Sequence, residues 1–349
     1  MIKVVIYVNK NQGIIGVLVC LCLLSLALTG SGGEATPSSD TVTIVDYTGQ
    51  SVEVPYPVDR VVSLSSSASE IICALGASDK IIGRGSSSIF PPYIEDVPIV
   101  GKSSYTPSIE LIIELDPDVL IADTMLTGDN REMIEAAGIP VIEESFVDPP
   151  RVTSVMSNLG LILDKEERAR ELISFIDQYQ SIIEERTADS RSEDKPAVFL
   201  ERGQPYRTAS ASTSSHNCIT TAGGINIASG ESVKYPTVSP EWVVEMNPEI
   251  IVRSVWATTG ETFTREDLKE ESDELLSRPG LSEVKAVKDG RVYVHSSKIN
   301  SGVRSIVGEL YFAKWFHPAV FEDIDPEAVH RDLVQEFYGL ELEGVYVYP

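Results

Sequence analysis

The chain has 349 residues, enough for two domains of ordinary size, and 42% of them are hydrophobic, which allows substantial cores. Its formal net charge of −25 excludes partners that display a phosphate backbone, so nucleic acid is not expected as a ligand. An anionic membrane surface would repel the folded part of the chain for the same reason.

The first forty residues are predicted to lie outside the folded part. Lys3 and Lys10 precede an uncharged run over residues 13–30, so residues 1–30 have the layout of a secretory signal or an N-terminal membrane anchor. Residues 31–40 predict a flexible tether. We therefore expect an exported protein, at the cell surface or in a periplasm-like space, that is released by cleavage or tethered through its N-terminus.

Strand and helix patterns alternate over residues 41–149, which predicts an N-terminal α/β lobe with a mostly parallel sheet. It begins with two strands around a turn at Thr48 and Gly49. Residues 150–189 carry two successive helical patterns and no strand pattern, so one long helix or two abutting helices are expected to link two lobes. Residues 190–349 alternate again and predict a C-terminal α/β lobe, with an edge strand over 289–294.

A repeated stretch relates the two halves. Residues 107–123 and 238–254 align without a gap, and each predicts a short helix, a stop at an Asp-Pro or Asn-Pro pair, and a buried strand. Ser108 and Ser239 can cap the two helices. The acids Glu110 and Glu241 stand in the first turn of each helix, where a negative charge suits the helix dipole. Two similar lobes, one per half, are the simplest explanation.

No catalytic or metal-binding motif is present, and the four histidines are scattered, so neither an enzyme nor a metal or organic cofactor is expected. His295 ends a strand pattern and remains open as a site residue or a core residue. In open parallel sheets, ligands bind at the carboxyl ends of strands. Forked arginine donors and flat rings there suit a bulky anionic ligand. The candidate ligand-binding residues are Arg84, Tyr105, Arg202, Tyr206, Trp256 and Arg304.

Several short stretches, in this order and spacing, resemble the substrate-binding proteins of ABC importers for iron–siderophore complexes, haem and cobalamin, which are class III periplasmic binding proteins. The resemblance covers roughly residues 41–339. The stretches that carry it are residues 43–55, 60–63, 70–76, 82–83, 116–121, 222–226, 247–251, 287–293 and 313–318.

The resemblance implies a non-enzymatic protein with two α/β lobes joined by a long helix, a ligand held between the lobes, and an ABC importer permease as the partner. Glu110 and Glu241 match the glutamates, one per lobe, that dock on the permease in this family. Many relatives are lipoproteins cleaved before a cysteine, and Ser31 stands where that cysteine would be.

Four functions remain open, one of which is a structural protein of the cell surface. The first is a monomeric carrier of an iron complex, such as a ferric siderophore-like chelate, which the arginines favour. The second is a corrinoid (cobalamin) carrier, because Trp256 and the tyrosines could flank a corrin ring. The third is a chelatase-like enzyme on a related scaffold, which would need a converging His and Glu pair.

Overall fold

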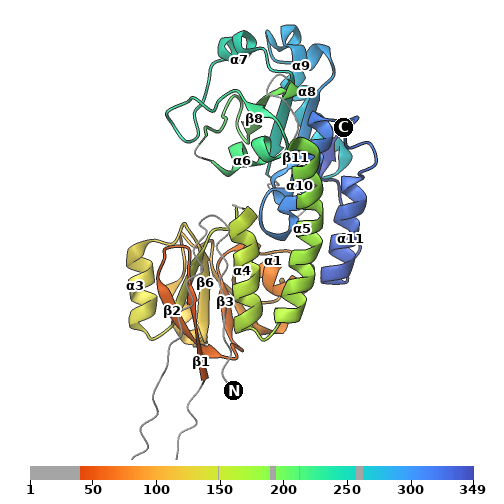
Figure 1. Ribbon diagram of the computed structural model, residues 1–349. Helices are drawn as coiled ribbons and strands as arrows, with labels where there is room; N and C mark the ends of the chain where they lie inside the picture. The colour runs from red at the N-terminus through yellow and green to blue at the C-terminus, as the bar shows by residue number, and fades with distance from the viewer. Residues whose placement is uncertain (1–39, 148, 189–193, 212, 257–261) are drawn as a thin grey trace, which may run out of the picture. The chain divides into compact units, whose positions relative to one another are not determined.

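Two five-stranded sheets and one hairpin form the framework of the protein in a computed structural model, which describes residues 40–147, 149–188, 194–211, 213–256 and 262–349 (Figure 1). The predicted leader and nearly all of the predicted tether, residues 1–39, lie outside the described residues. Among the helices that are described, none is both long enough and apolar enough to cross a membrane.

The first sheet is entirely parallel, as the alternating patterns predict. Its strand order is β5-β4-β3-β6-β7. The strands are β3 (Val61–Ser63), β4 (Ile81–Gly85), β5 (Ile99–Gly101), β6 (Val119–Asp123) and β7 (Val141–Glu144). The connecting helices are α1 (Ser66–Ala74), α2 (Ile109–Leu115) and α3 (Gly128–Ala136). The hairpin of β1 (Asp40–Val45) and β2 (Ser51–Tyr56) precedes this sheet, with its turn at the predicted place.

The second sheet has the order β12-β11-β10-β8-β9. Its strands are β8 (Ala197–Arg202), β9 (Ile225–Asn226), β10 (Ile250–Val255), β11 (Val292–Ser296) and β12 (Val347–Tyr348). Its helices are α6 (Ser214–Thr221), α7 (Pro240–Met246), α8 (Arg265–Leu276), α9 (Lys285–Lys288), α10 (Ser305–Phe316) and α11 (Pro326–Tyr338). The prediction of an edge strand over 289–294 is wrong, because the end of the chain returns as β12 and pairs antiparallel with β11.

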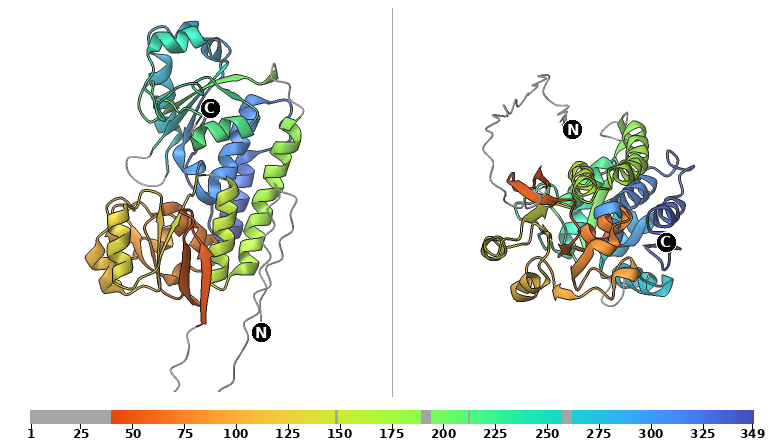
Figure 2. Two further views of the ribbon diagram at one scale, coloured as in Figure 1. Left: turned by 60° about the vertical axis from the view of Figure 1, so that its left-hand side comes forward. Right: turned by 90° about the horizontal axis from the view of Figure 1, so that it is seen from below.

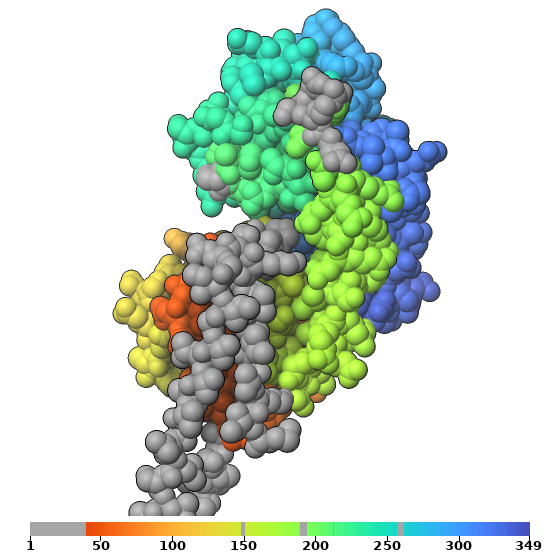
Figure 3. Space-filling view, in the orientation of Figure 1, coloured from red at the N-terminus to blue at the C-terminus, as the bar shows by residue number. Residues whose placement is uncertain are grey.

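Two abutting helices occupy the segment between the sheets, which decides between the alternatives that the sequence left open. The helix α4 (Pro149–Ile162) ends before Asp164, which adopts a left-handed conformation with φ of 57°, and α5 (Glu166–Ala188) follows. Gly160 permits the close approach of the two helices, since a Cβ atom there would lie 2.5 Å from the Cβ of Ala169. In both views of Figure 2, α5 runs beside α4 and α10, and its outer surface is the yellow-green band of Figure 3.

The sequence repeat is also a structural repeat. The helices α2 and α7 end at left-handed residues of nearly identical geometry, Asp116 (φ 46°, ψ 62°) and Asn247 (φ 44°, ψ 58°). The acid after each proline then accepts a backbone hydrogen bond from the start of the neighbouring strand, Asp118 from Arg60 and Glu249 from Ala197. The capping differs between the copies, because the Ser239 side chain accepts from Trp242 N whereas Ser108 makes no side-chain cap.

A buried ion pair connects α1 to the short turn that precedes α10. Glu70 accepts two hydrogen bonds of 2.9 Å from Nε and Nη2 of Arg304, and the Arg304 side chain is fully buried. The guanidinium also lies 4.6 Å from the ring centroid of Phe90. The backbone N–H of Gly302 donates to Phe146 O at 2.9 Å in the same region. These contacts join residues that are more than 150 positions apart in the chain.

Candidate functional site

Two loops pair with each other where β8 ends. Arg202 N donates to Arg207 O at 2.7 Å, which closes a tight turn directly after the strand. The segment that follows lies antiparallel to residues 234–238, with Thr208 N donating to Pro236 O at 2.9 Å and Val238 N donating to Tyr206 O at 3.0 Å. This pairing brings two stretches that are about thirty positions apart in the sequence to one place at the carboxyl end of the sheet.

The paired loops assemble a cluster of basic and aromatic side chains, which we call the basic cluster: Arg202, Arg207, Lys234, Tyr235 and Trp256. The Arg202 guanidinium carbon lies 4.6 Å from the ring centroid of Tyr235 and 5.6 Å from that of Trp256. Arg207 and Lys234 lie 5.7 Å from the same Tyr235 ring. Three cations therefore surround one half-buried ring.

Trp256 is the exposed aromatic face of this cluster. It follows β10 directly, and 46% of its surface is exposed. Its indole lies against Gly203, because a Cβ atom there would come within 1.8 Å of the indole Cζ3. Gly203 also has φ of 66°, a conformation that favours glycine. The glycine thus provides both the turn and the flat contact on which the indole rests.

The three cations of the basic cluster have no carboxylate partner within ion-pair distance among the residues that the structure describes. Other arginines of the described residues, such as Arg131, Arg253 and Arg278, do pair with acids. Unpaired guanidinium and ammonium groups beside open aromatic faces are suited to bind an anion that also carries a flat or bulky apolar part.

The predicted ligand-binding residues fall into two groups. Arg202 and Trp256 come together in the basic cluster, whereas Arg84 and Arg304 are buried and do not stand in open strand-end loops as the sequence interpretation assumed. Arg84 lies within β4, and its guanidinium donates to the carbonyls of Gly85 and Glu95. Arg304 is held by Glu70. Both arginines satisfy structural groups, so the basic cluster does not include them.

Tyr105 and Tyr206 differ in their surroundings. Tyr105 is 63% exposed in the turn after β5. Tyr206 lies in the turn after β8, and its ring contacts the Arg278 guanidinium, whose carbon lies 4.9 Å from the ring centroid. The structure therefore gives Tyr206 a role in holding the turn, which the sequence did not suggest.

Three members of the basic cluster, Arg207, Lys234 and Tyr235, were not among the predicted site residues. Arg207 could have been included, because it shares a loop with Arg202. Lys234 and Tyr235 stand just before the second copy of the repeat and have no motif of their own. Only the antiparallel pairing of the two loops shows that they belong to the same site.

The carboxyl end of the first sheet offers polar groups of another kind. Ser69 Oγ lies 2.9 Å from Ser63 Oγ and 3.1 Å from Ser88 Oγ, which forms a small buried network of serines. Asp123 ends β6, where burial raises the pKa of its carboxyl. Basic groups without ion-pair partners thus gather at the second sheet, whereas the described end of the first sheet presents hydroxyls and an acid.

His295, which the sequence left open, is a core residue. It is fully buried, its Nδ1 lies 3.0 Å from Ser296 O, and its ring packs edge-on against Phe312. Burial lowers the pKa of the imidazole to about 4, so the ring is neutral. No group of three or more His, Cys, Asp or Glu side chains in the described ranges is arranged to hold a metal ion.

The two glutamates of the repeat are both exposed. Glu110 and Glu241 stand in the first turns of α2 and α7, seven-residue helices that end in the same left-handed geometry. The structure therefore repeats an exposed acid, in the same local setting, once beside each sheet.

Comparisons with known proteins identify the family. The family model for periplasmic binding proteins matches residues 61–298. An uncharacterized ABC transporter substrate-binding lipoprotein of Bacillus subtilis, YvrC, is 25% identical over 328 residues, which covers 88% of this chain and 98% of the relative. A vitamin B12-binding protein of Yersinia pestis is 30% identical over 204 residues, 56% of this chain and 69% of the relative.

The fold has solved counterparts as well. The crystal structure of FepB, a TroA-like periplasmic binding protein from Veillonella parvula, superposes with a TM-score of 0.75 at 25% identity and covers 88% of this chain and 99% of that one. The overall arrangement described above is thus that of a known architecture. The chain belongs to the periplasmic binding protein family and is a solute-binding protein of an ABC importer.

Proposed function

We propose that this protein captures an anionic iron complex, such as a ferric siderophore-like chelate, and delivers it to the permease of an ABC importer. The observation that carries the proposal is the basic cluster, in which Arg202, Arg207 and Lys234 surround Tyr235 beside the exposed Trp256. A ferric chelate built from aromatic or acidic groups carries negative charge and flat surfaces, and the cluster offers a partner for each.

The charge of the whole protein strengthens this reasoning. A net charge of −25 repels an anion at long range, so an anionic ligand needs a local region of the opposite sign. The basic cluster is such a region. Each charge-assisted hydrogen bond from it would contribute about 1.5–3 kcal/mol to binding.

A corrinoid is the second candidate. One relative that is 30% identical is named a vitamin B12-binding protein, and Trp256, with 46% of its surface exposed, offers a face on which a corrin ring could stack. A corrinoid carries far less negative charge than a ferric tris-catecholate. Binding of the iron complex should therefore require the three cations of the basic cluster, whereas binding of a corrinoid should not.

The proposal also assigns the parts of the chain that bind the ligand and those that contact the permease. We assign residues 41–149 and 190–349 to two lobes that hold the ligand between them, linked by α4 and α5. Glu110 and Glu241 are proposed to dock on the permease, one from each lobe. Their exposure and their repeated setting at the starts of α2 and α7 support this role.

Tryptophan fluorescence titration of the protein tests the choice of ligand. A ferric tris-catecholate, haem and cobalamin are titrated side by side into the wild type and into an Arg202→Gln, Arg207→Gln double variant. Saturable quenching by the ferric chelate, weakened about 100-fold or more in the variant, supports the iron proposal, since two charge-assisted bonds are lost. Saturation by cobalamin alone, with equal affinity in both proteins, would replace iron by the corrinoid.

A further inference from the structure

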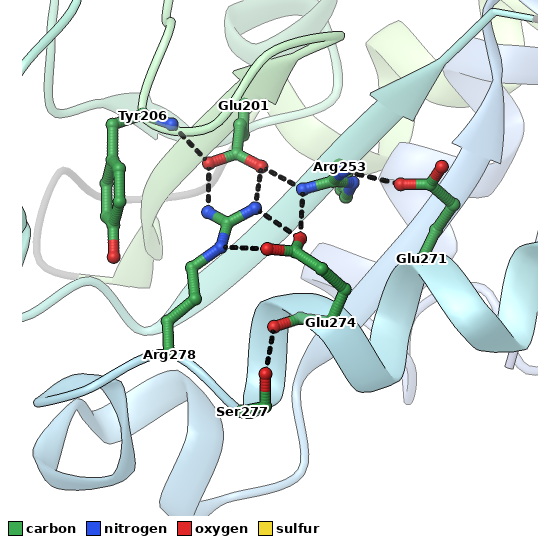
Figure 4. A network of polar contacts seen from close by, with 7 residues as sticks. All are labelled: Glu201, Tyr206, Arg253, Glu271, Glu274, Ser277 and Arg278. Carbon is green, nitrogen blue, oxygen red and sulfur yellow. Dashed lines mark hydrogen bonds and ion pairs between the residues drawn. The ribbon is translucent and has the colours of Figure 1, made fainter.

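A buried carboxylate stands next to the basic cluster in the sequence and beside it in the fold. Glu201 is the residue before Arg202 on β8, and it is fully buried. Its two oxygens accept from Nη1 and Nη2 of Arg278 at 2.6 and 3.0 Å and from Nη1 of Arg253 at 2.5 Å (Figure 4). Burying a charge is costly unless it is paired in good geometry, so the position of this carboxylate is strongly determined.

Glu201 also binds the turn of residues 202–207, which carries Arg202 and Arg207 of the basic cluster. The backbone N–H of Tyr206 donates to Glu201 Oε2 at 2.6 Å. Tyr206 has φ of 60°, a left-handed conformation that costs free energy for a residue with a side chain. The Arg278 guanidinium, already bound to Glu201, lies 4.9 Å from the Tyr206 ring centroid. Glu201 and Arg278 together therefore compensate the unfavourable conformation of Tyr206.

The conformation of Tyr206 decides where the cations stand. Its carbonyl accepts from Val238 N at 3.0 Å, and the turn around it is closed by the bond from Arg202 N to Arg207 O at 2.7 Å. These two bonds set the separation of Arg202 from Arg207 and hold both beside Tyr235. A turn released from Glu201 would keep the same residues without their common orientation.

Two acids of helix α8 bind the same two arginines that bind Glu201. Glu274 accepts from Arg253 at 3.0 Å and from Arg278 at 2.6 and 3.0 Å, and Glu271 accepts from Arg253. Glu274 is about half exposed, whereas both arginines are mostly buried. The acids of α8 thus keep the two arginines fixed on Glu201, and the helix is coupled to the turn through them.

Resting on the proposed function, we propose that Glu201 is a positioning residue for ligand capture. It does not touch the ligand, and it holds the turn of residues 202–207 through Tyr206 so that the cations of the basic cluster act on one anion together. The substitution Glu201→Gln is the sharpest test, because it preserves the size of the side chain and removes the charge that fixes Arg278 and Arg253.

The test has one readout that needs no ligand. The indole of Trp256 packs on Gly203, which lies in the turn of residues 202–207. The accessibility of Trp256 to acrylamide therefore reports whether this turn keeps its conformation. The fluorescence of Trp256 alone is obtained by subtracting the emission of each protein with Trp256→Phe added from the emission of the same protein without it. We expect Glu201→Gln to increase acrylamide quenching of Trp256. We also expect it to weaken binding of a ferric tris-catecholate about tenfold, the size of one misdirected charge-assisted bond.

A matched control is Asp46→Asn. Asp46 is a buried carboxylate of the β1–β2 turn, paired with Arg131 at 3.0 Å, and it has no contact with the basic cluster. It should lower thermal stability as Glu201→Gln does and change neither Trp256 quenching nor affinity. If Glu201→Gln does not fold, Glu274→Gln perturbs the same network from its exposed side and should change both readouts in the same direction.

The outcomes separate the two proposals. If the wild type does not bind the ferric tris-catecholate, the proposed ligand is refuted. Acrylamide quenching of Trp256 still decides in that case whether Glu201 holds the turn. Unchanged quenching and unchanged affinity in a folded Glu201→Gln protein, with stability lowered as in the control, would show that Glu201 stabilises the fold and positions nothing.

Discussion

Replacing Glu70 by glutamine tests the ion pair that joins α1 to the turn before α10. The side chains of Arg304 and Glu70 are 0% and 7% exposed, and both carboxylate oxygens accept from the guanidinium at 2.9 Å. Removing one partner of a buried ion pair costs about 3–5 kcal/mol. At 2–4 °C per kcal/mol, the melting temperature should fall by roughly 6–20 °C.

A double-mutant cycle identifies the cause of this loss. Urea unfolding, followed by circular dichroism, gives the free energy of unfolding of the wild type, Glu70→Met, Arg304→Met and the Glu70→Met, Arg304→Met double variant, with Glu70→Gln measured alongside. We expect each single variant to lose more than the double variant, because a buried ion pair is often replaced by apolar side chains at little cost to stability. A Glu70→Gln protein within about 0.5 kcal/mol of the wild type would refute the reasoning, since surface substitutions have effects of that size.

Three further predictions concern other parts of the molecule. Burial raises the pKa of Glu309 to about 8, above its value in the unfolded chain, so the stability that this carboxyl contributes is present at low pH and is lost as the pH rises through 8. Glu309→Gln should therefore flatten the decline in melting temperature between pH 5 and pH 8, and an unaltered slope would contradict this. Gly203→Ala would place a Cβ atom 1.8 Å from the indole of Trp256 at a φ of 66°, so the emission of Trp256 should shift to longer wavelength while Gly290→Ala, with nothing near its Cβ position, leaves it unchanged. Charge reversal at Glu110 and Glu241 together should abolish transport in a reconstituted importer with ligand affinity intact, and undiminished uptake would remove both residues from the permease interface.

Much of the fold could be predicted from the sequence because it depends on local patterns. Continuous apolar runs such as those of β6 and β10 indicate strands covered on both faces, and the Asp-Pro and Asn-Pro pairs end α2 and α7 where the left-handed caps are found. The gap-free repeat predicted two equivalent units, and the structure repeats even the cap dihedral angles. These features are determined by backbone sterics and by periodicity, which neighbouring residues specify.

The site depended on tertiary structure because its members come from separate segments. Arg84 and Arg304 were plausible ligand groups from their positions in the chain, but the fold buries both, and a buried guanidinium is costly unless it is paired, so each is bound to carbonyls or to Glu70. The return of the C-terminus as β12, which turns a predicted edge strand into an inner one, is likewise a pairing of residues far apart.

The sequence by itself determined the family architecture, the repeat and its two exposed acids, since apolar periodicity and proline stops act over a few residues. Tertiary structure alone decided which cations share one site. Arg202, Arg207 and Lys234 meet because two loops pair, and Tyr206, which takes part in that pairing, has a positive φ and donates its N–H to the buried carboxylate of Glu201. Charges so far apart in the sequence acquire a common function only when the fold supplies the partners that orient them.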